Sequence, residues 1–171
     1  MNRKNEAHDI VMESLMGALL QLMRNKRLSE INISELCAKA GVSRVSFYRN
    51  FNSFDDILVQ YLKKTTDDWW EDFIAREPDL SYEVFWQELF DLYKEHAQLI
   101  RLLQKNNVTY LLKDHIFACC GPKPEHDART AYICAMVAGA IYGTVDEWIR
   151  RGMGDAPDGA FFREILSAAG L

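Results

Sequence analysis

The chain has 171 residues, of which 49% are hydrophobic and 26% are charged, and its net charge is −5 at pH 7. This apolar fraction excludes a disordered chain. The longest apolar run, residues 132–145, is too short to span a bilayer, and the four cysteines form no CxxC pair. The first residues, MNRKNEAHD, have no apolar segment behind them of the kind that a secretory signal needs. We therefore expect a reduced, cytoplasmic protein without a membrane partner.

Charge is distributed unevenly along the chain. Residues 1–52 carry eight Lys or Arg and five Asp or Glu, a net of +3, whereas residues 53–171 carry twelve and twenty, a net of −8. A basic segment joined to an acidic one is typical of a localised nucleic-acid-binding surface.

The first predicted helix covers residues 4–24, where apolar or small residues recur on one face. We expect this face to cover the two short helices that follow, which cannot bury a core alone. Arg3 and Lys4 stand at the start of this helix. They fit a basic arm that touches phosphate and a frayed terminus equally well.

Residues 32–51 predict two short helices joined by a tight turn. Asn32 can cap the first helix, and Glu35 stands three residues on, as in a capping box. Gly41 follows the last residue of the apolar repeat, where a left-handed backbone ends a helix. Ser43 can cap the second helix.

The second short helix has an inner and an outer face. Phe47 and Phe51, four residues apart, are its inward residues. The positions without a role in the core are Arg44, Val45, Ser46, Tyr48 and Arg49. A basic, hydroxyl-rich and aromatic face suits a DNA major groove, although a helical hairpin with a solvated face would show the same spacing.

The string NISELCAKAGVSRVSFYRNF closely resembles the helix-turn-helix of TetR/AcrR-family transcriptional regulators. Their pattern runs roughly Thr-apolar-x-x-Ile-Ala-x-x-Ala-Gly-Val-Ser-x-x-x-apolar-Tyr-x-x-Phe. The later string GAIYGTVDEWIRRGM resembles the C-terminal part of such chains. The resemblance implies an all-α protein of about nine helices. Residues 1–52 would form a three-helix DNA-binding domain, and residues 53–171 a helical regulatory and dimerisation domain.

The resemblance also implies roles for single residues. Arg44 and Ser46 would read bases, with Arg44 pairing bidentately with guanine. Ser43, Tyr48 and Arg49 would contact phosphates, which position the protein without reading sequence. The full predicted DNA-binding set is Asn32, Ser34, Lys39, Ser43, Arg44, Val45, Ser46, Tyr48 and Arg49. The chain departs from the family at Phe54, where a Lys usually meets the DNA backbone.

Helical patterns continue to the end of the chain. The predicted helices cover residues 53–74, begin again at Ser81 and run through HAQLIRLLQ, and then cover residues 108–120, 125–151 and 158–168. Ser53 with Asp56 forms a second capping box, and Pro78 and Gly121-Pro122 interrupt the helices.

The long helix at residues 125–151 has a small residue at every fourth position, which leaves one edge without bulk. In the resembled family the last two helices pair with those of a second copy. We therefore expect a homodimer. Its predicted interface residues are Ala131, Ala135, Gly139, Tyr142, Gly143, Ile149, Phe161 and Ile165.

The C-terminal part is rich in aromatics, which are core residues by default. As a set they exceed what a small bundle needs, and members of the resembled family bind small ligands between these helices. The candidate pocket residues are Trp86, Phe90, Tyr110, Phe117, Tyr132 and Met136. Because the segment is acidic, we expect a neutral apolar or aromatic effector, or a cationic one.

The sequence gives little support to a metal site, a reactive thiol or an enzyme active site. His115 and Cys119 stand four apart on one predicted helix, but one pair does not make a metal site. The adjacent Cys119 and Cys120 have no flanking cation to activate a thiol. There is no nucleophile-and-base set, P-loop or dinucleotide Gly motif, so we expect neither an enzyme nor a resident cofactor or metal.

The resemblance implies a regulator that binds double-stranded operator DNA, most often as a repressor released by a small effector. The alternative keeps the DNA-binding helices but uses the C-terminal part to dock another protein, as in a co-regulator or activator. A helical enzyme is the third interpretation, and the one that the sequence supports least.

Overall fold

The structure is a computed structural model, and it describes residues 3–77 and 81–168. Within these ranges all regular secondary structure is helical, which confirms the all-α prediction and the expected number of helices. The elements are α1 (Arg3–Asn25), η1 (Leu28–Glu30), α2 (Ile33–Ala40), α3 (Arg44–Asn50), α4 (Phe54–Arg76), α5 (Tyr82–Glu95), α6 (Ala97–Lys105), α7 (Tyr110–Cys120), α8 (Ala128–Arg150) and α9 (Gly159–Ala168).

The helices form two compact units. The first unit comprises the chain up to Thr65 together with Leu102–His115, and the second comprises Thr66–Arg101 and the chain from Ile116 onward. The functional boundary predicted at residue 52 lies inside the first unit and stays a prediction.

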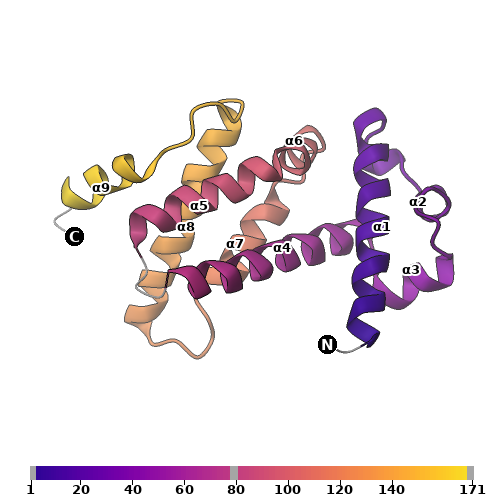
Figure 1. Cartoon of the computed structure of the whole chain (residues 1–171), viewed down its shortest axis with the longest axis horizontal. Coiled ribbons are helices and arrows are strands. Elements are labelled where there is room, and N and C mark those ends of the chain that lie inside the picture. Colours follow the sequence, from indigo (N-terminus) through magenta and orange to yellow (C-terminus); the bar gives the residue numbers. More distant parts are fainter. Residues whose placement is uncertain (1–2, 78–80, 169–171) are drawn as a thin grey trace. The chain divides into compact units, whose positions relative to one another are not determined.

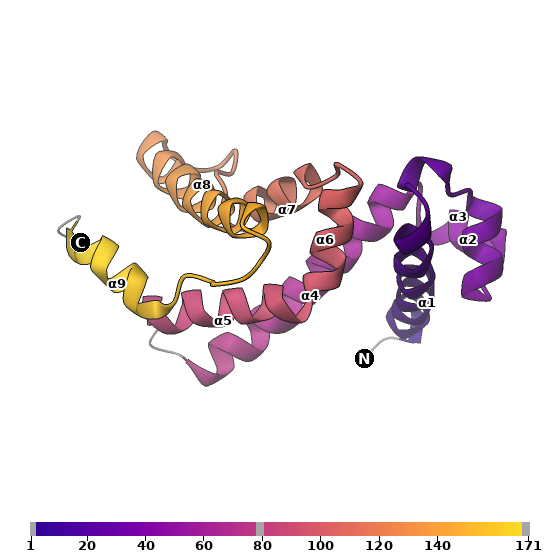
Figure 2. The same cartoon turned by 90° about the horizontal axis from the view of Figure 1, so that it is seen from above.

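In the first unit, α1 packs against α2 and α3, which lie side by side with it in both views (Figures 1 and 2). Leu15 and Leu19 of α1 are fully buried, as are Leu36 of α2 and Phe47 of α3. Burial of such a side chain contributes about 1.5–3 kcal/mol. The shared core therefore stabilises two helices that are too short to persist alone.

The end of α1 is held by groups from a distant part of the chain. Lys105 Nζ donates to the carbonyl of Arg24 at 2.8 Å, and the Leu28 amide donates to Oδ1 of Asn106 at 2.7 Å. In the connection between α1 and α2, Leu28–Glu30 form a 3-10 turn. The Arg27 amide donates to Oε2 of Glu30 at 2.8 Å and fixes the start of this turn.

In the second unit, α9 packs on α5 mainly through aromatic rings (Figure 2). Phe162 stacks on Trp86 with 4.0 Å between ring centroids and 5° between planes. Phe90, which is fully buried, meets Trp148 of α8 edge to face at 5.4 Å. These rings make one core from α5, α8 and α9.

Polar contacts fix the first turn of α9. The carboxylate of Asp158 accepts from the Phe161 amide at 2.9 Å and caps the helix. A Cβ at Gly159 would lie 3.1 Å from both Cβ and the carbonyl oxygen of Glu83, so glycine permits the close approach to α5. Arg163 donates to both carboxylate oxygens of Glu83, which lowers the pKa of that carboxyl.

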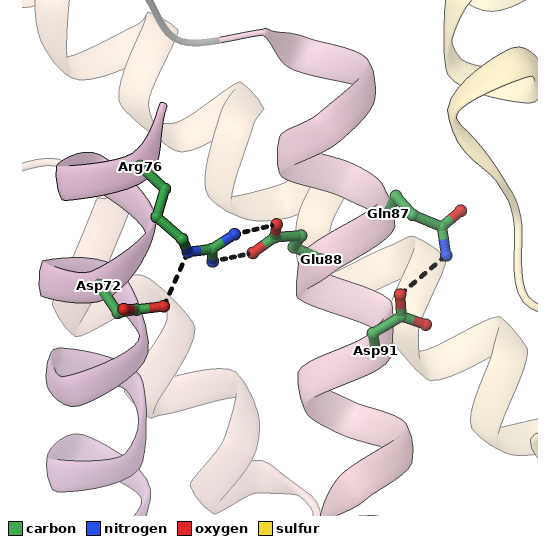
Figure 3. Close-up of polar contacts among 5 residues, drawn as sticks. All are labelled: Asp72, Arg76, Gln87, Glu88 and Asp91. Carbon is green, nitrogen blue, oxygen red and sulfur yellow. Dashed lines mark hydrogen bonds and ion pairs between the residues drawn. The ribbon is translucent and has the colours of Figure 1, made fainter. Parts of the chain in front are cut away.

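An ion-pair cluster joins the end of α4 to α5 (Figure 3). The Arg76 guanidinium donates to the two carboxylate oxygens of Glu88 at 2.8 and 2.6 Å, and its Nε donates to Asp72 at 2.9 Å. Hydrogen bonds from Arg76 to Glu88 and then to Asp72 raise the pKa of the guanidinium. Because the group is exposed, its bidentate geometry orients the helices more than it stabilises them.

The continuous helix predicted from Ser81 through HAQLIRLLQ was wrong. α5 ends at Glu95 and α6 begins at Ala97, and His96 between them has φ −96° and ψ 19°. This backbone conformation lies outside the α region and redirects the chain, although neither Gly nor Pro marks the position.

Among the described helices, none is long and apolar enough to cross a membrane.

Replacing Phe162 with Ala is expected to lower the free energy of unfolding of the second unit by about 3–5 kcal/mol, because the stacked ring leaves a cavity. Phe161→Ala is the matched control, since Phe161 is 44% exposed and Phe162 only 7%. Urea unfolding followed by Trp fluorescence measures both variants. Equal losses for the two would show that the Trp86–Phe162 stack does not hold α9.

Candidate nucleic-acid interface

Both ends of α2 have the predicted caps. Oδ1 of Asn32 accepts from the Glu35 amide at 2.9 Å, and Gly41 ends the helix with φ +67°. The predicted capping box is incomplete, because the Glu35 carboxylate accepts from Lys26 Nζ at 2.5 Å instead of reaching back to Asn32. The pair ties α2 to the segment that follows α1.

α3 begins at the predicted residue, and Phe47 within it and Phe51 directly after it are turned inward. Oγ of Ser43 accepts from the Ser46 amide at 3.0 Å. Phe47 and Phe51 are buried, with 6.2 Å between their ring centroids. Cys37 of α2 is also buried, which raises the pKa of its thiol and leaves it a core residue.

The opposite face of α3 is open. Val45 is 69% exposed and Tyr48 55% exposed, although both are large and apolar or aromatic. Of the nine predicted DNA-binding residues, all are exposed except the half-buried Ser46, namely Asn32, Ser34, Lys39, Ser43, Arg44, Val45, Tyr48 and Arg49. Within the described part of the chain, no ion pair with a carboxylate engages Arg44 or Arg49. Their charge remains available to a partner.

The start of α4 is a polar network. Oγ of Ser53 accepts from the Asp56 amide at 3.0 Å, and the Asp56 carboxylate accepts from the Asn52 amide at 2.9 Å. Asp55 accepts from the hydroxyl of Tyr110 at 2.7 Å, which raises the pKa of this phenol. Tyr110 was expected in a ligand pocket, but it is exposed in the first unit, whereas the other candidates belong to the second.

Sequence patterns missed one contact beneath this surface. His8 of α1 lies between Asn50 of α3 and Gln60 of α4, and its two ring nitrogens lie 3.0 and 3.1 Å from their amide oxygens. No local signal could identify it, because the partners lie 42 and 52 residues away.

The remaining pocket candidates do not form one cavity lining. Trp86 and Phe90 belong to the packed core with Phe162, and Phe117 is half-buried. Tyr132 and Met136 are 73% and 74% exposed, one turn apart on α8, so they line no enclosed site within the unit. The expectation was wrong for these two because the face of α8 that carries them is not covered.

Some of the predicted dimer-interface residues are exposed, and others are half-buried or buried. A Cβ at Gly139 or Gly143 would meet nothing within 4 Å, so this edge of α8 is open. Ala131, Ala135 and Tyr142 are half-buried, and Phe161 of α9 is exposed. Ile149 is only 3% exposed and offers no surface to a partner, which corrects that prediction. The side chain of Ile165 lies outside the described residues.

A second aromatic group joins α4 to α5 within the second unit. This Trp69 cluster comprises Trp69, Trp70, Phe73 and Phe85, with ring centroids 5.5–6.4 Å apart. Nε1 of Trp69 is buried and has no hydrogen-bond partner among the described residues. An unpaired buried donor costs about 1–3 kcal/mol, and a bound acceptor would offset that cost.

The cysteine and histidine positions have no metal-site geometry. Cys119 is exposed and Cys120 half-buried, and burial raises the pKa of the Cys120 thiol. His115 is buried on the same helix. Nowhere in residues 3–77 and 81–168 do three His, Cys, Asp or Glu residues gather as ligands for one ion.

Compared with models of known protein families and with curated protein sequences, the chain has no match. A functional interpretation therefore depends on the geometry of α2 and α3 and on the residues exposed there.

Proposed function

We propose that this chain is a TetR-like, DNA-binding transcriptional regulator that acts as a homodimer in the cytoplasm. The observation that carries the proposal is the division of α3 into two faces. Phe47 and Phe51 anchor it in the core, while Arg44, Val45 and Tyr48 are exposed together. A short helix held from behind with a basic and aromatic front is the geometry that enters a major groove.

In this proposal the residues of the outer face of α3 and its cap have two different roles in DNA binding. Arg44, in the first turn of α3, reads a guanine edge through two of its three guanidinium nitrogens. Ser46 is a second base-reading residue. Tyr48 and Arg49, further along the helix, bind phosphates together with Ser43. Packing within the chain does not explain why Val45 and Tyr48 are exposed. In the proposed complex, Val45 suits contact with a thymine methyl group.

The dimer would form on α8. Its uncovered face carries large apolar side chains beside the open glycine edge, namely Tyr132, Ile133, Met136 and Val137. Contiguous exposed apolar surface marks an interaction site. A second copy is the partner that fits, because Gly139 and Gly143 allow two such helices to approach closely and the same patch meets itself across a twofold axis.

We further propose that the regulator is a repressor whose effector binds at the Trp69 cluster. The aromatic rings and the unpaired Nε1 of Trp69 support an aromatic compound that carries a hydrogen-bond acceptor. The acidic charge of the C-terminal part favours neutral or cationic compounds. Binding there would shift the population away from the DNA-binding arrangement. The alternative, a co-regulator, would instead use the exposed α8 face to dock another protein.

Arg44→Ala is expected to weaken binding to a specific duplex by about 1–3 kcal/mol and to change non-specific binding much less. Tyr48→Phe should weaken binding to all duplexes alike, because a phosphate contact carries no sequence information. The probe is a duplex selected from a randomised library with the wild-type protein, compared with random DNA by fluorescence anisotropy. Equal losses on both duplexes for Arg44→Ala would show that Arg44 does not read bases.

Met136→Glu is expected to convert the dimer to monomers, because it places like charges across an apolar interface. Gly139→Leu should do the same by separating the helices, and it leaves the packing of one chain intact because the site is open. Ile10→Glu is the control, an equally conspicuous exposed apolar residue on α1. Sedimentation at micromolar concentration measures the oligomeric state of the wild type and the variants. A monomeric wild-type protein would contradict the proposed dimer.

Neutral or cationic aromatic compounds with an acceptor are expected to raise the melting temperature of the wild-type protein by about 5–10 °C at a hundredfold excess over Kd. The shift should disappear in Trp69→Phe, which lacks the donor. Trp70→Phe is the matched control, because Trp70 is exposed in the same cluster. If no compound in the screen stabilises the wild-type protein, the co-regulator alternative becomes the better proposal.

A further inference from the structure

Glu35 is the only carboxylate in the stretch from Ile31 to Asn52, which contains α2, the turn and α3. The same stretch carries three basic residues, Lys39, Arg44 and Arg49, and all of them are exposed. A carboxylate beside such a surface repels the phosphates that the basic residues attract, whatever the sequence of the bases. The proposed DNA-binding surface therefore has one unfavourable charge on its first helix.

A residue from outside this stretch covers that charge. Nζ of Lys26, which directly follows α1, donates to Oε1 of Glu35 at 2.5 Å. Lys39 lies one turn beyond Glu35 on α2, yet it makes no ion pair with any residue that the structure describes. The carboxylate is thus neutralised by the end of α1, and the lysine on its own helix keeps its charge for a partner.

The backbone that carries Lys26 is fixed on both sides. The Lys26 amide donates to the carbonyl of Leu22 at 3.0 Å and so continues the last turn of α1. Two residues later, the Leu28 amide donates to Oδ1 of Asn106 at 2.7 Å. A side chain on an ordered backbone loses less conformational freedom when it forms an ion pair. Lys26 therefore holds its ammonium at Glu35 without needing DNA to place it.

We propose that Lys26 is a positioning residue for DNA binding, which acts by neutralising the Glu35 carboxylate and not by touching DNA itself. The inference rests on the proposed function, because it concerns how the surface of α2 and α3 receives phosphate. Without Lys26, the carboxylate either faces the phosphates or draws Lys39 away from them. In both cases the surface loses one positive charge.

Two other roles for the Lys26–Glu35 pair lead to different expectations. If the pair only tied α2 to the end of α1, the loss of either partner would weaken DNA binding. If Lys26 contacted a phosphate directly, its loss would weaken binding whatever residue replaced Glu35. Neutralisation alone makes the two single changes act in opposite directions and cancel when they are combined.

The test is a cycle of Lys26→Met, Glu35→Gln and the double variant, made in the full chain. Both changes keep the length of the side chain and remove its charge, and Gln is compatible with the third position of a capped helix. Affinity for the library-selected duplex and for random DNA is measured by fluorescence anisotropy. Lys26→Met should weaken binding to both duplexes about three- to fivefold, the effect of one unit charge a few ångströms from a phosphate in water. Glu35→Gln should tighten binding to both by a similar factor, and the double variant should bind like the wild type.

The salt dependence provides a readout that a structural role would not change in this way. Between about 50 and 200 mM salt, the slope of log K against log salt should become shallower in Lys26→Met and steeper in Glu35→Gln, by up to about 0.9 in each case. The double variant should keep the wild-type slope, because its surface has the wild-type charge.

Lys94→Met is the matched control for the change in net charge. Lys94 pairs with Asp91 at 2.9 Å on α5 of the second unit, and its side chain is 44% exposed, as is that of Lys26. The control should leave both affinity and salt slope unchanged. Because exposed pairs contribute little to stability, every variant should melt within about 4 °C of the wild type.

A double variant as weak as Lys26→Met would overturn the proposal in favour of a direct phosphate contact. Weaker binding by all three variants would overturn it in favour of a structural pair, and unchanged binding by all three would show that the pair has no part in DNA binding. A wild-type chain that binds neither duplex would contradict the proposed function, and this inference would be rejected with it.

Discussion

The burial of Phe47 within a helix of seven residues, and of Phe51 directly after it, is the constraint on which the exposed face of α3 depends. So short a helix has almost no stability of its own, because nucleation costs more than its few hydrogen bonds return. Phe47 and Phe51 lie four residues apart and both are buried, Phe51 as the residue that ends α3. The other side chains of the helix therefore point outward or toward its flanks, which explains why Val45 and Tyr48 are exposed.

The features that the sequence predicted correctly are local. Asn32 and Ser43 each cap a helix through the predicted side chain, and α5 begins after Ser81 as predicted. Gly41 has the left-handed backbone expected at the end of α2. A cap depends on residues three positions apart, so one chain segment contains all the information. For the same reason the helix limits predicted for α1, α4 and α9 lie within a few residues of those observed.

The errors concern residues whose burial is determined by segments that lie far away in the sequence. α8 is apolar on more than one side, and its periodicity cannot tell which side the rest of the chain covers. Ile149 therefore appeared available although it is buried, and Tyr132 and Met136 appeared internal although they are exposed. The contacts of His8 and the unpaired donor of Trp69 were likewise invisible, because their surroundings come from other helices.

The contacts at the end of α1 have a consequence for how the chain folds during synthesis. The carbonyl of Arg24 and the amide of Leu28 find their partners on Lys105 and Asn106, about eighty residues later. A nascent chain that has reached only the end of α3 lacks both groups. The end of α1 and the turn Leu28–Glu30 are therefore completed only when residues 105 and 106 have left the ribosome, although α2 and α3 follow them directly in the sequence. Their order of appearance in the sequence is not the order in which their structure becomes complete.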